Sequence, residues 1–248
     1  MQKISIVTVC YNAAATIGET IESVLGQTYP NVEYIIIDGG STDGSVDIIK
    51  QYADRLAYWV SEPDNGIYDA MNKGIAVATG EFINFMNAGD KYYDDKVIQD
   101  VFSRPYSDHS AVIYGKTLMH YPWGKYIVSP RNFPNCHQST FIRLSIHKDR
   151  PFDLSYKISA DFHFFLSIYK SSPQSFVLYH NVIAIYDHTN GISSQYSDTH
   201  LSEVERVMGK RQMNFRIKRM IKKFIPHNLY NIIYRIFFYF NSQYKRVR

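Results

Sequence analysis

The chain has 248 residues, which suits one large domain or a domain with an appendage, and its 45% hydrophobic content suffices for a full core. Its two cysteines are too few for a disulfide framework, which excludes the small disulfide-stabilised class and indicates a reducing, cytoplasmic setting. The net charge of +4 combines a balance of −8 over residues 1–205 with +12 over residues 206–248, where no acid occurs. We expect neither a signal peptide nor a membrane span, because the sequence shows no cleavage site and no run of about 18 apolar residues.

The first 95 residues alternate apolar strand patterns with helical periodicity across short connections. Such a β-α-β-α-β-α-β order predicts an α/β fold with a mostly parallel sheet, right-handed crossovers and helices on both faces. Strands are predicted over 3–9, 32–38, 56–60 and 81–86, and helices over 17–25, 45–52 and 67–78.

Beyond residue 95 the pattern becomes less regular, which predicts a mixed rather than a wholly parallel sheet. A helix is expected over 160–170, with Ser159 as its cap, and helix resumes near His200. The other predicted segments are a strand at 111–115, a hairpin at 116–128, a loop at 132–140, a strand or pair at 175–187 and a loop at 188–194.

Polar residues follow each of the four predicted strands of the first half. They are Tyr11-Asn12, Asp38 to Asp43, Asp64-Asn65 and Asn87 to Asp90. Because the carboxyl ends of parallel strands share one edge, we expect these residues to converge on one rim of the sheet, where open α/β folds bind ligands. Turn and capping roles are the alternative explanation, and for Asp43 capping of the next helix is the favoured role.

Four motifs in register carry a specific resemblance. They read Thr8-Val-Cys-Tyr-Asn12, Asp38-Gly-Gly-Ser-Thr-Asp-Gly44, Asp64-Asn-Gly-Ile-Tyr-Asp-Ala-Met-Asn-Lys-Gly74 and Asn87-Ala-Gly-Asp90. In this order and spacing the chain resembles glycosyltransferase family 2, the inverting nucleotide-sugar transferases of the GT-A fold. The resemblance covers about residues 1–195 and implies a GT-A domain over 1–200, with a nucleotide-binding half (1–95) and an acceptor-side half (96–200).

The resemblance also implies a donor site formed by the first loops. The nucleotide-binding residues would be Thr8, Tyr11, Asn12, Asp38, Asp64 and Asn87. A uracil N–H suits a strand-end carboxylate such as Asp38, and an aromatic ring such as Tyr11 can stack on the base. Packing of Tyr11 on the first helix and a turn role for Asp38 remain open.

The segment from Asn87 to Asp90 corresponds to the family's metal-binding Asp-X-Asp, with Asn87 and Gly89 as departures. Asp90 keeps the position of the direct metal ligand, and His188 falls where some relatives place a metal- or diphosphate-binding His. The resemblance therefore implies Mn²⁺ or Mg²⁺ as cofactor, and a single carboxylate indicates that the ion arrives with the nucleotide diphosphate. A surface or core hydrogen-bonding role for His188 and an inactive relative are the alternatives.

Asp161 lies where the family has its catalytic Glu or Asp. It is in the first turn of a predicted helix, whose N-terminus favours the ionised carboxylate. The resemblance implies that Asp161 is the base that takes the acceptor's proton, and a simple helix-dipole role is the alternative. His137 and Gln138 lie in a loop expected to line the acceptor side.

The basic segment 206–248 repeats apolar residues at helical spacing between Lys and Arg. This pattern predicts amphipathic helices over 201–248 that lie on an anionic membrane surface, with packing on the domain as the alternative. The apolar stripe argues against nucleic acid. We therefore expect a cytoplasmic enzyme, peripheral at the inner face of the cell membrane.

The function expected from the resemblance is transfer of a hexosyl-type sugar, from UDP in particular, to a glycan or polyprenyl-diphosphate-linked acceptor. Such a reaction would build an O-antigen, a capsule or an exopolysaccharide. Two alternatives stay open. A nucleotidyltransferase would favour a glycine-rich, lysine-bearing loop after the first strand, which Tyr11-Asn12-Ala13 is not. An inactive nucleotide-sugar-binding assembly subunit is the second.

Overall fold

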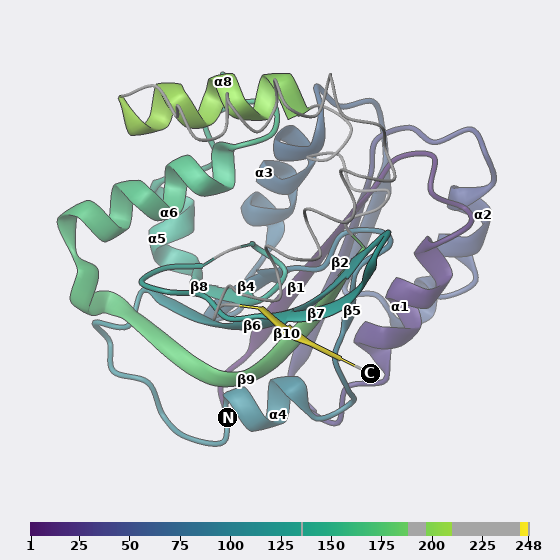
Figure 1. The fold of residues 1–248 in the computed structure, drawn as a ribbon. Coiled ribbons are helices and arrows are strands. Elements are labelled where there is room, and N and C mark those ends of the chain that lie inside the picture. The colour runs from purple at the N-terminus through teal and green to yellow at the C-terminus, as the bar shows by residue number, and fades with distance from the viewer. Residues whose placement is uncertain (135, 188–196, 210–243, 248) are drawn as a thin grey trace.

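The computed structural model describes residues 1–134, 136–187, 197–209 and 244–247, and shows a mixed sheet with helices on both faces (Figure 1). Its strands are β1 (Ile4–Cys10), β2 (Val32–Asp38), β3 (Tyr58–Ser61), β4 (Phe82–Phe85), β5 (Lys91–Tyr92), β6 (Val112–Tyr121), β7 (Gly124–Val128), β8 (Thr140–Arg143), β9 (Phe176–Asp187) and β10 (Tyr244–Arg246). Its helices are α1 (Ile17–Leu25), α2 (Ser45–Lys50), α3 (Ile67–Val77), α4 (Val97–Val101), α5 (Leu144–Asp149), α6 (Ala160–Ser171) and α8 (Ser197–Met208), with 3₁₀ turns η1 (Ala53–Arg55) and η2 (Pro173–Ser175).

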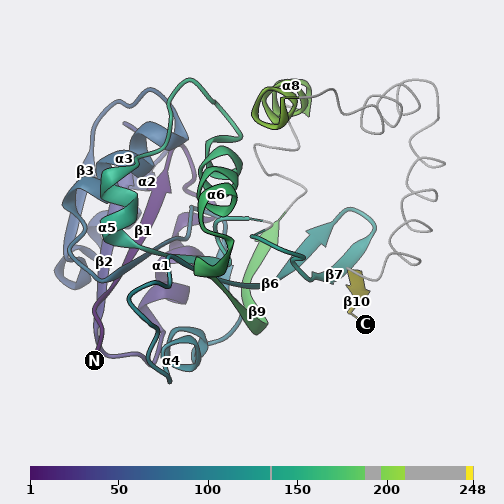
Figure 2. The same ribbon diagram turned by 90° about the vertical axis from the view of Figure 1, so that its left-hand side faces the viewer.

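The sheet has a parallel half and an antiparallel half. Strands β4, β1, β2 and β3 are parallel neighbours in that order. Beyond β4, the strands β8, β6, β7 and β10 follow in antiparallel pairs, and β9 runs parallel to β6. In the turned view the β6–β7 hairpin and β10 lie on the side of the sheet away from β2 and β3 (Figure 2). The carboxyl ends of the four parallel strands therefore share one edge, as predicted.

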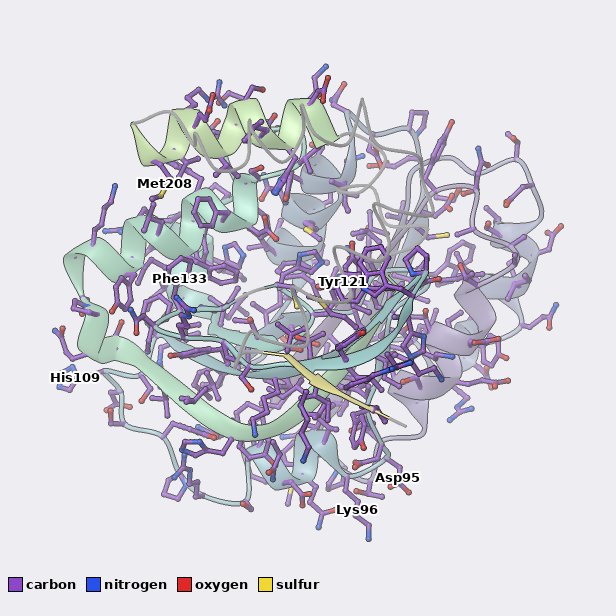
Figure 3. The ribbon with its side chains drawn as sticks, in the orientation of Figure 1. Asp95, Lys96, His109, Tyr121, Phe133 and Met208 are labelled. Atoms are coloured by element: carbon purple, nitrogen blue, oxygen red, sulfur yellow. The ribbon has the colours of Figure 1, made fainter. Side chains whose placement is uncertain are left out.

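Alternating side chains divide the core into two layers. In β1, Val7 and Val9 face the layer under α3, α5 and α6, whereas Ile4 and Ile6 face the layer under α1, α2 and α4. Side chains fill both layers, and Phe133 packs beside α6 (Figure 3). Strands β1, β2 and β4 are covered on both faces and consist mainly of apolar residues, whereas the edge strand β3 is partly exposed. The predicted strands of the first half are confirmed to within two residues.

The second half differs from the expectation at several elements. Thr140, predicted to end a loop, begins β8, and the short elements β5, α4 and α5 were not predicted. The strand β8 has only four residues, and it is fixed by antiparallel pairing to β4 and β6 rather than by its own pattern. Ser159 precedes α6 as predicted, but its side chain forms no cap hydrogen bond.

The C-terminal expectation needs correction where the structure describes it. Residues 244–246 form a strand, β10, that pairs with β7, so this part of the predicted helical tail belongs to the sheet. Helix α8 crosses residue 200, the predicted end of the transferase domain, and contacts α6. Residues 210–243 lie outside the described residues. Among the described helices, none is long and apolar enough to cross a membrane.

Candidate active site

The loops after β1 and β2 are tied to each other at the shared edge of the sheet. Asn12, whose φ is +47°, donates its backbone N–H to Ser41 Oγ at 2.8 Å and accepts the Thr42 N–H on its side chain at 3.0 Å. Asp43 accepts the N–H groups of Ala14 and Ser45, so it caps α2, as predicted, and also anchors the loop after β1. These contacts fix the two loops as one rigid surface.

Asp38 is a support of this surface rather than an open acceptor. It is fully buried at the end of β2, and its carboxylate accepts the N–H groups of Gly40 and Ser41 and the hydroxyls of Ser41 and Ser61. Burial alone would raise the pKa of Asp38, but these hydrogen bonds outweigh it and lower the pKa. These hydrogen bonds give Asp38 a structural role at the end of β2, and its contact with a nucleobase stays a prediction.

Thr8 has a similar internal position. Its side chain is fully buried in β1, and its hydroxyl bonds with the Tyr34 hydroxyl at 2.9 Å and the Met86 carbonyl at 2.7 Å. The hydroxyl therefore connects β1 to the strands on either side of it. This position gives Thr8 a packing role instead of the expected contact with the donor.

Asp64 and Tyr11 supply the open groups of this edge. The Tyr11 ring is 66% exposed, so it does not pack on α1. A Cβ added to Gly39 would overlap Asp64 Oδ2, and it would lie 3.4 Å from Tyr11 Cδ2. The Asp64 carboxylate and the Tyr11 ring are thus neighbours across the bare backbone of Gly39. A glycine at position 39 makes room for a carboxylate that comes from a different loop.

We predict that Gly39→Ala lowers the affinity for the donor and leaves the stability of the fold nearly unchanged. The new methyl group would push the half-exposed Asp64 side chain aside at little cost in folding, because only a flexible side chain must move. We expect affinity for a UDP donor to fall about tenfold, which corresponds to ~1.4 kcal/mol. Titration calorimetry with UDP measures this change, and thermal unfolding should show a nearly unchanged midpoint.

Gly44→Ala is the matched control for this experiment. Gly44 has φ +99° and nothing within 4 Å of an added Cβ, so the change should lower stability by about 1 kcal/mol through backbone strain and leave UDP affinity unaltered. Equal affinity of the Gly39→Ala variant and the wild type would contradict the role of Asp64.

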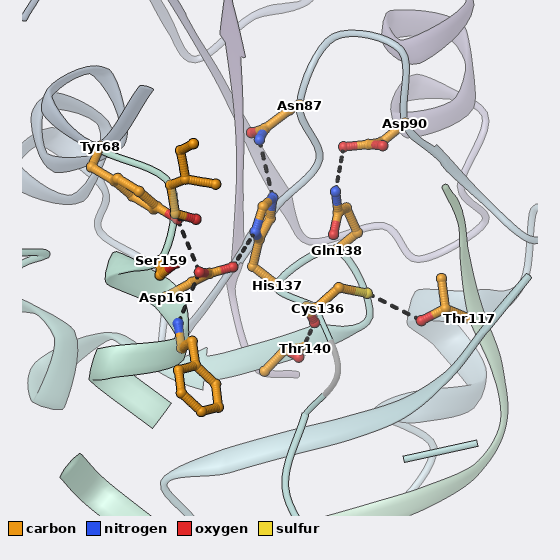
Figure 4. Close-up of polar contacts among 12 residues, drawn as sticks. Tyr68, Asn87, Asp90, Thr117, Cys136, His137, Gln138, Thr140, Ser159 and Asp161 are labelled. Carbon is orange, nitrogen blue, oxygen red and sulfur yellow. Dashed lines mark hydrogen bonds and ion pairs between the residues drawn. The ribbon is translucent and has the colours of Figure 1, made fainter. Parts of the chain in front are cut away.

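A second cluster joins the loop after β4 to the start of α6 (Figure 4). His137 Nδ1 lies 2.9 Å from Asp161 Oδ2, and Asn87 Nδ2 lies 3.0 Å from His137 Nε2. Since the Asn87 amide donates to Nε2, the neutral tautomer with its proton on Nδ1 satisfies both contacts. His137, expected on the acceptor side, is therefore the bridge between Asn87 and the candidate base.

Asp161 is held by three groups that favour its ionised form. Besides His137, the Tyr68 hydroxyl lies 2.9 Å and the Phe162 N–H 2.8 Å from Oδ1. Burial alone would raise the pKa of Asp161, but the hydrogen bonds from His137, Tyr68 and Phe162 hold it below its usual value. A largely buried carboxylate kept in its charged form is suited to accept a proton.

Asp90 occupies the other end of the cluster. It is 5% exposed, and Gln138 donates to its Oδ2 at 2.9 Å, so the expected acceptor residue Gln138 instead positions Asp90. Burial raises the pKa of Asp90 to about 7, although the charge of His137 and the Gln138 hydrogen bond oppose the rise. A bound cation would favour the ionised form of this carboxylate.

The residues around Asp90 fit a hard cation bound together with a diphosphate. Asn87 Oδ1 and Gln138 Oε1 are buried without a hydrogen-bond partner, so they can accept hydrogen bonds from waters that such an ion retains. Within the described ranges no group of three His, Cys, Asp or Glu forms a metal cage, so Asp90 would be the protein's ligand there. His188, the other expected ligand, lies outside the described residues.

The structure thus brings most of the expected residues to one edge of the sheet. Loops of this kind at the carboxyl edge of parallel strands, with the largely buried Asp161 carboxylate beside them, are typical of α/β proteins that bind a ligand at this edge of the sheet. The chain belongs to glycosyl transferase family 2, whose family model matches residues 5–173, and it is a glycosyltransferase.

Known proteins similar to this chain agree. A PGL/p-HBAD biosynthesis glycosyltransferase of Mycobacterium bovis is 31% identical over 209 residues, which cover 78% of this chain and 80% of that protein. The putative teichuronic acid biosynthesis glycosyltransferase TuaG of Bacillus subtilis is 38% identical over 97 residues, or 38% of each chain.

Solved structures confirm the GT-A fold. S. aureus TarS 1-349 in complex with UDP-GlcNAc matches with a TM-score of 0.64 at 20% identity, over 78% of this chain and 61% of TarS 1-349. The mannosyltransferase PcManGT from Pyrobaculum calidifontis, in complex with GDP-Man and Mn²⁺, matches with a TM-score of 0.62 at 15% identity, over 83% and 64%. The chain thus spans about three fifths of the TarS fragment.

Proposed function

We propose that the enzyme transfers a hexosyl-type sugar from a UDP-sugar to a hydroxyl of a surface-polysaccharide acceptor, with inversion at the anomeric carbon. The observation that carries this proposal is the Asp161 carboxylate, largely buried and held by His137 and Tyr68, in one hydrogen-bonded cluster with Asn87. His137 contacts Asp161, and the next residue, Gln138, contacts Asp90. The proposed base, Asp161, and the proposed diphosphate site at Asp90 would therefore be held in fixed positions relative to each other.

The donor would lie across the loops after β1, β3 and β4. The Tyr11 ring would stack on the uracil, and Asp64 would accept its N–H. Asn12 would act indirectly, because its side chain fixes the loop that supports Gly39. Asn87 would accept a hydrogen bond on its buried Oδ1, the atom that has no partner in the protein.

Transfer would proceed by a single displacement. Asp161 would take the proton of the acceptor hydroxyl as the acceptor oxygen bonds to the anomeric carbon, and the diphosphate would leave with the electron pair of the broken bond. The Phe162 N–H, His137 and Tyr68 orient the carboxylate for this step. Asp90 would hold a divalent cation together with the diphosphate, and such a cation would supply a sink for the charge of the leaving group.

The class of acceptor is inferred from the relatives. Their names place them in the biosynthesis of PGL/p-HBAD and teichuronic acid, and the TarS fragment was solved with UDP-GlcNAc. We infer a cell-surface glycan, attached to a polyprenyl diphosphate carrier, as the acceptor. A peripheral position at the inner face of the membrane would bring the enzyme to such a carrier.

The membrane contact would depend on the basic part of the C-terminal segment that lies outside the described residues. Replacing Arg216, Lys218, Arg219, Lys222 and Lys223 by Gln in the full chain should abolish co-sedimentation with vesicles that contain anionic lipid, since each basic residue contributes ~1 kcal/mol near such a surface. Turnover on a soluble acceptor should persist. Unchanged co-sedimentation of this variant would contradict the membrane proposal.

A panel of labelled UDP- and GDP-sugars tests the proposed reaction. We expect acceptor-dependent transfer from a UDP-sugar, with an inverted anomeric configuration in the product. Tight UDP binding without turnover on any donor would favour the alternative of an inactive assembly subunit. Release of diphosphate from a nucleoside triphosphate would favour a nucleotidyltransferase, an activity that membership of glycosyl transferase family 2 does not support.

A further inference from the structure

Glu203 of α8 places its carboxylate on three consecutive backbone N–H groups. Oε1 accepts from Lys157 at 2.7 Å, and Oε2 accepts from Ile158 at 3.0 Å and Ser159 at 2.9 Å. The residue is 7% exposed. These three N–H groups belong to the turn that leads into α6, only a few residues before Asp161.

Helix α6 has no side-chain cap of the ordinary kind. Ser159 is at the cap position, but its hydroxyl bonds with His200 Nδ1 at 3.0 Å instead of the helix's own N–H groups. Arg206 adds a third attachment, because its guanidinium donates to the Ser155 carbonyl at 2.9 Å and stacks over the Tyr156 ring at 3.7 Å. Helix α8 thus holds the turn 155–159 almost entirely through polar contacts.

The Ile158 peptide links this attachment to the proposed base. Its N–H donates to Glu203, and its carbonyl lies 2.7 Å from the Tyr68 hydroxyl. The same hydroxyl lies 2.9 Å from Asp161 Oδ1. A tyrosine hydroxyl has one proton for these two acceptors, so a shift of the Ile158 peptide changes how Tyr68 is shared and therefore where Asp161 is held.

We propose that Glu203 is a positioning residue for Asp161 and acts through the Ile158 peptide and Tyr68. The inference rests on the proposed role of Asp161 as base. Because Tyr11 and Asp64 lie on loops that Glu203 does not touch, the loss of its carboxylate changes turnover and leaves donor binding intact. Precise placement of a reacting group contributes strongly to rate, which makes a small displacement measurable.

Glu203→Gln in the full chain tests the proposal. The side chain keeps its length, but its NH₂ group cannot accept a hydrogen bond, so one or two of the three N–H groups lose their partner. We expect kcat to fall at least tenfold and the Kd for UDP to stay within twofold. Glu203→Asp keeps the charge one methylene shorter and should give an intermediate kcat, which preserves the test should Glu203→Gln fold poorly.

Leu201→Ala is the matched control. Leu201 is a buried apolar residue of α8, so its truncation loosens the helix and leaves the Glu203 carboxylate in place. Equal losses of kcat for Leu201→Ala and Glu203→Gln, at equal losses of Tm, would show that Glu203 only stabilises α8 and would overturn the inference. Failure of the base assignment is distinct: Asp161→Asn would then retain turnover, whatever Glu203→Gln does.

Discussion

Asp161→Asn should lower turnover by at least ~10²-fold and leave UDP affinity unchanged. The amide keeps the shape of the carboxylate, and its single oxygen can still accept from the Phe162 N–H, so the fold should persist. It cannot take a proton from the acceptor hydroxyl. Steady-state transfer with a UDP-sugar measures kcat, and calorimetry with UDP measures donor binding on the same sample.

Asp153→Asn is the control for Asp161→Asn. Asp153 lies in the same segment before α6, is exposed and accepts only a local N–H from Ser155, so its loss should leave kcat nearly unchanged. The pH profile adds a second readout. Because the pKa of Asp161 is held below its usual value, the wild-type rate should show no acidic limb from this group near neutral pH. A near-normal rate of Asp161→Asn would remove Asp161 from the mechanism.

The position of the site was predictable from the sequence because it follows from the topology. Apolar strands that are covered on both faces must be parallel neighbours when helices connect them, so the residues after β1, β2 and β4 had to meet at one edge. The motif order then selected the family. Asp161 could be located because its segment matches the family's motif at a helix start.

The different roles of the individual carboxylates could not be predicted from the sequence. Asp38 and Asp64 both lie at the ends of strands. Only the three-dimensional contacts show that Ser41 and Ser61 donate hydrogen bonds to Asp38, and that Gly39 leaves room for Asp64. The sequence indicated His137 and its neighbour Gln138 as a polar pair in a loop. The partners of His137, which are Asp161 and Asn87, lie 24 and 50 positions away in the chain. Contacts of this range carry no local periodicity, so a sequence pattern cannot reveal them.

Glu203 illustrates the same limit for the backbone. Ser159 before an apolar run predicts a helix cap, and a local cap is the rule for such a sequence. In the folded chain the Ser159 hydroxyl bonds with His200 instead, and a carboxylate from α8 binds the N–H groups of the three residues before the helix. The helix start was therefore predicted correctly, while the group that stabilises it was not.

Asp90→Asn should abolish the dependence of the enzyme on a divalent cation and lower turnover by at least ~10²-fold, since charge stabilisation by a bound ion contributes several kcal/mol. The amide can still contact Gln138, so the loop after β4 should keep its position. Titration of Mn²⁺ or Mg²⁺ into the wild type should raise kcat and tighten UDP binding. In the variant neither effect should appear, whereas Asp95→Asn, an exposed change in the following segment, should behave as the wild type.

The order of binding follows from the same residues. With Asn87 and Gly89 in place of two acids, Asp90 is the one carboxylate of its loop, and one carboxylate binds a hydrated ion weakly. We therefore expect no measurable Mn²⁺ binding to the protein alone and clear binding once UDP is present, because the diphosphate supplies the remaining charge. Tight Mn²⁺ binding to the nucleotide-free protein would mean that a further acid, outside this cluster, completes the site.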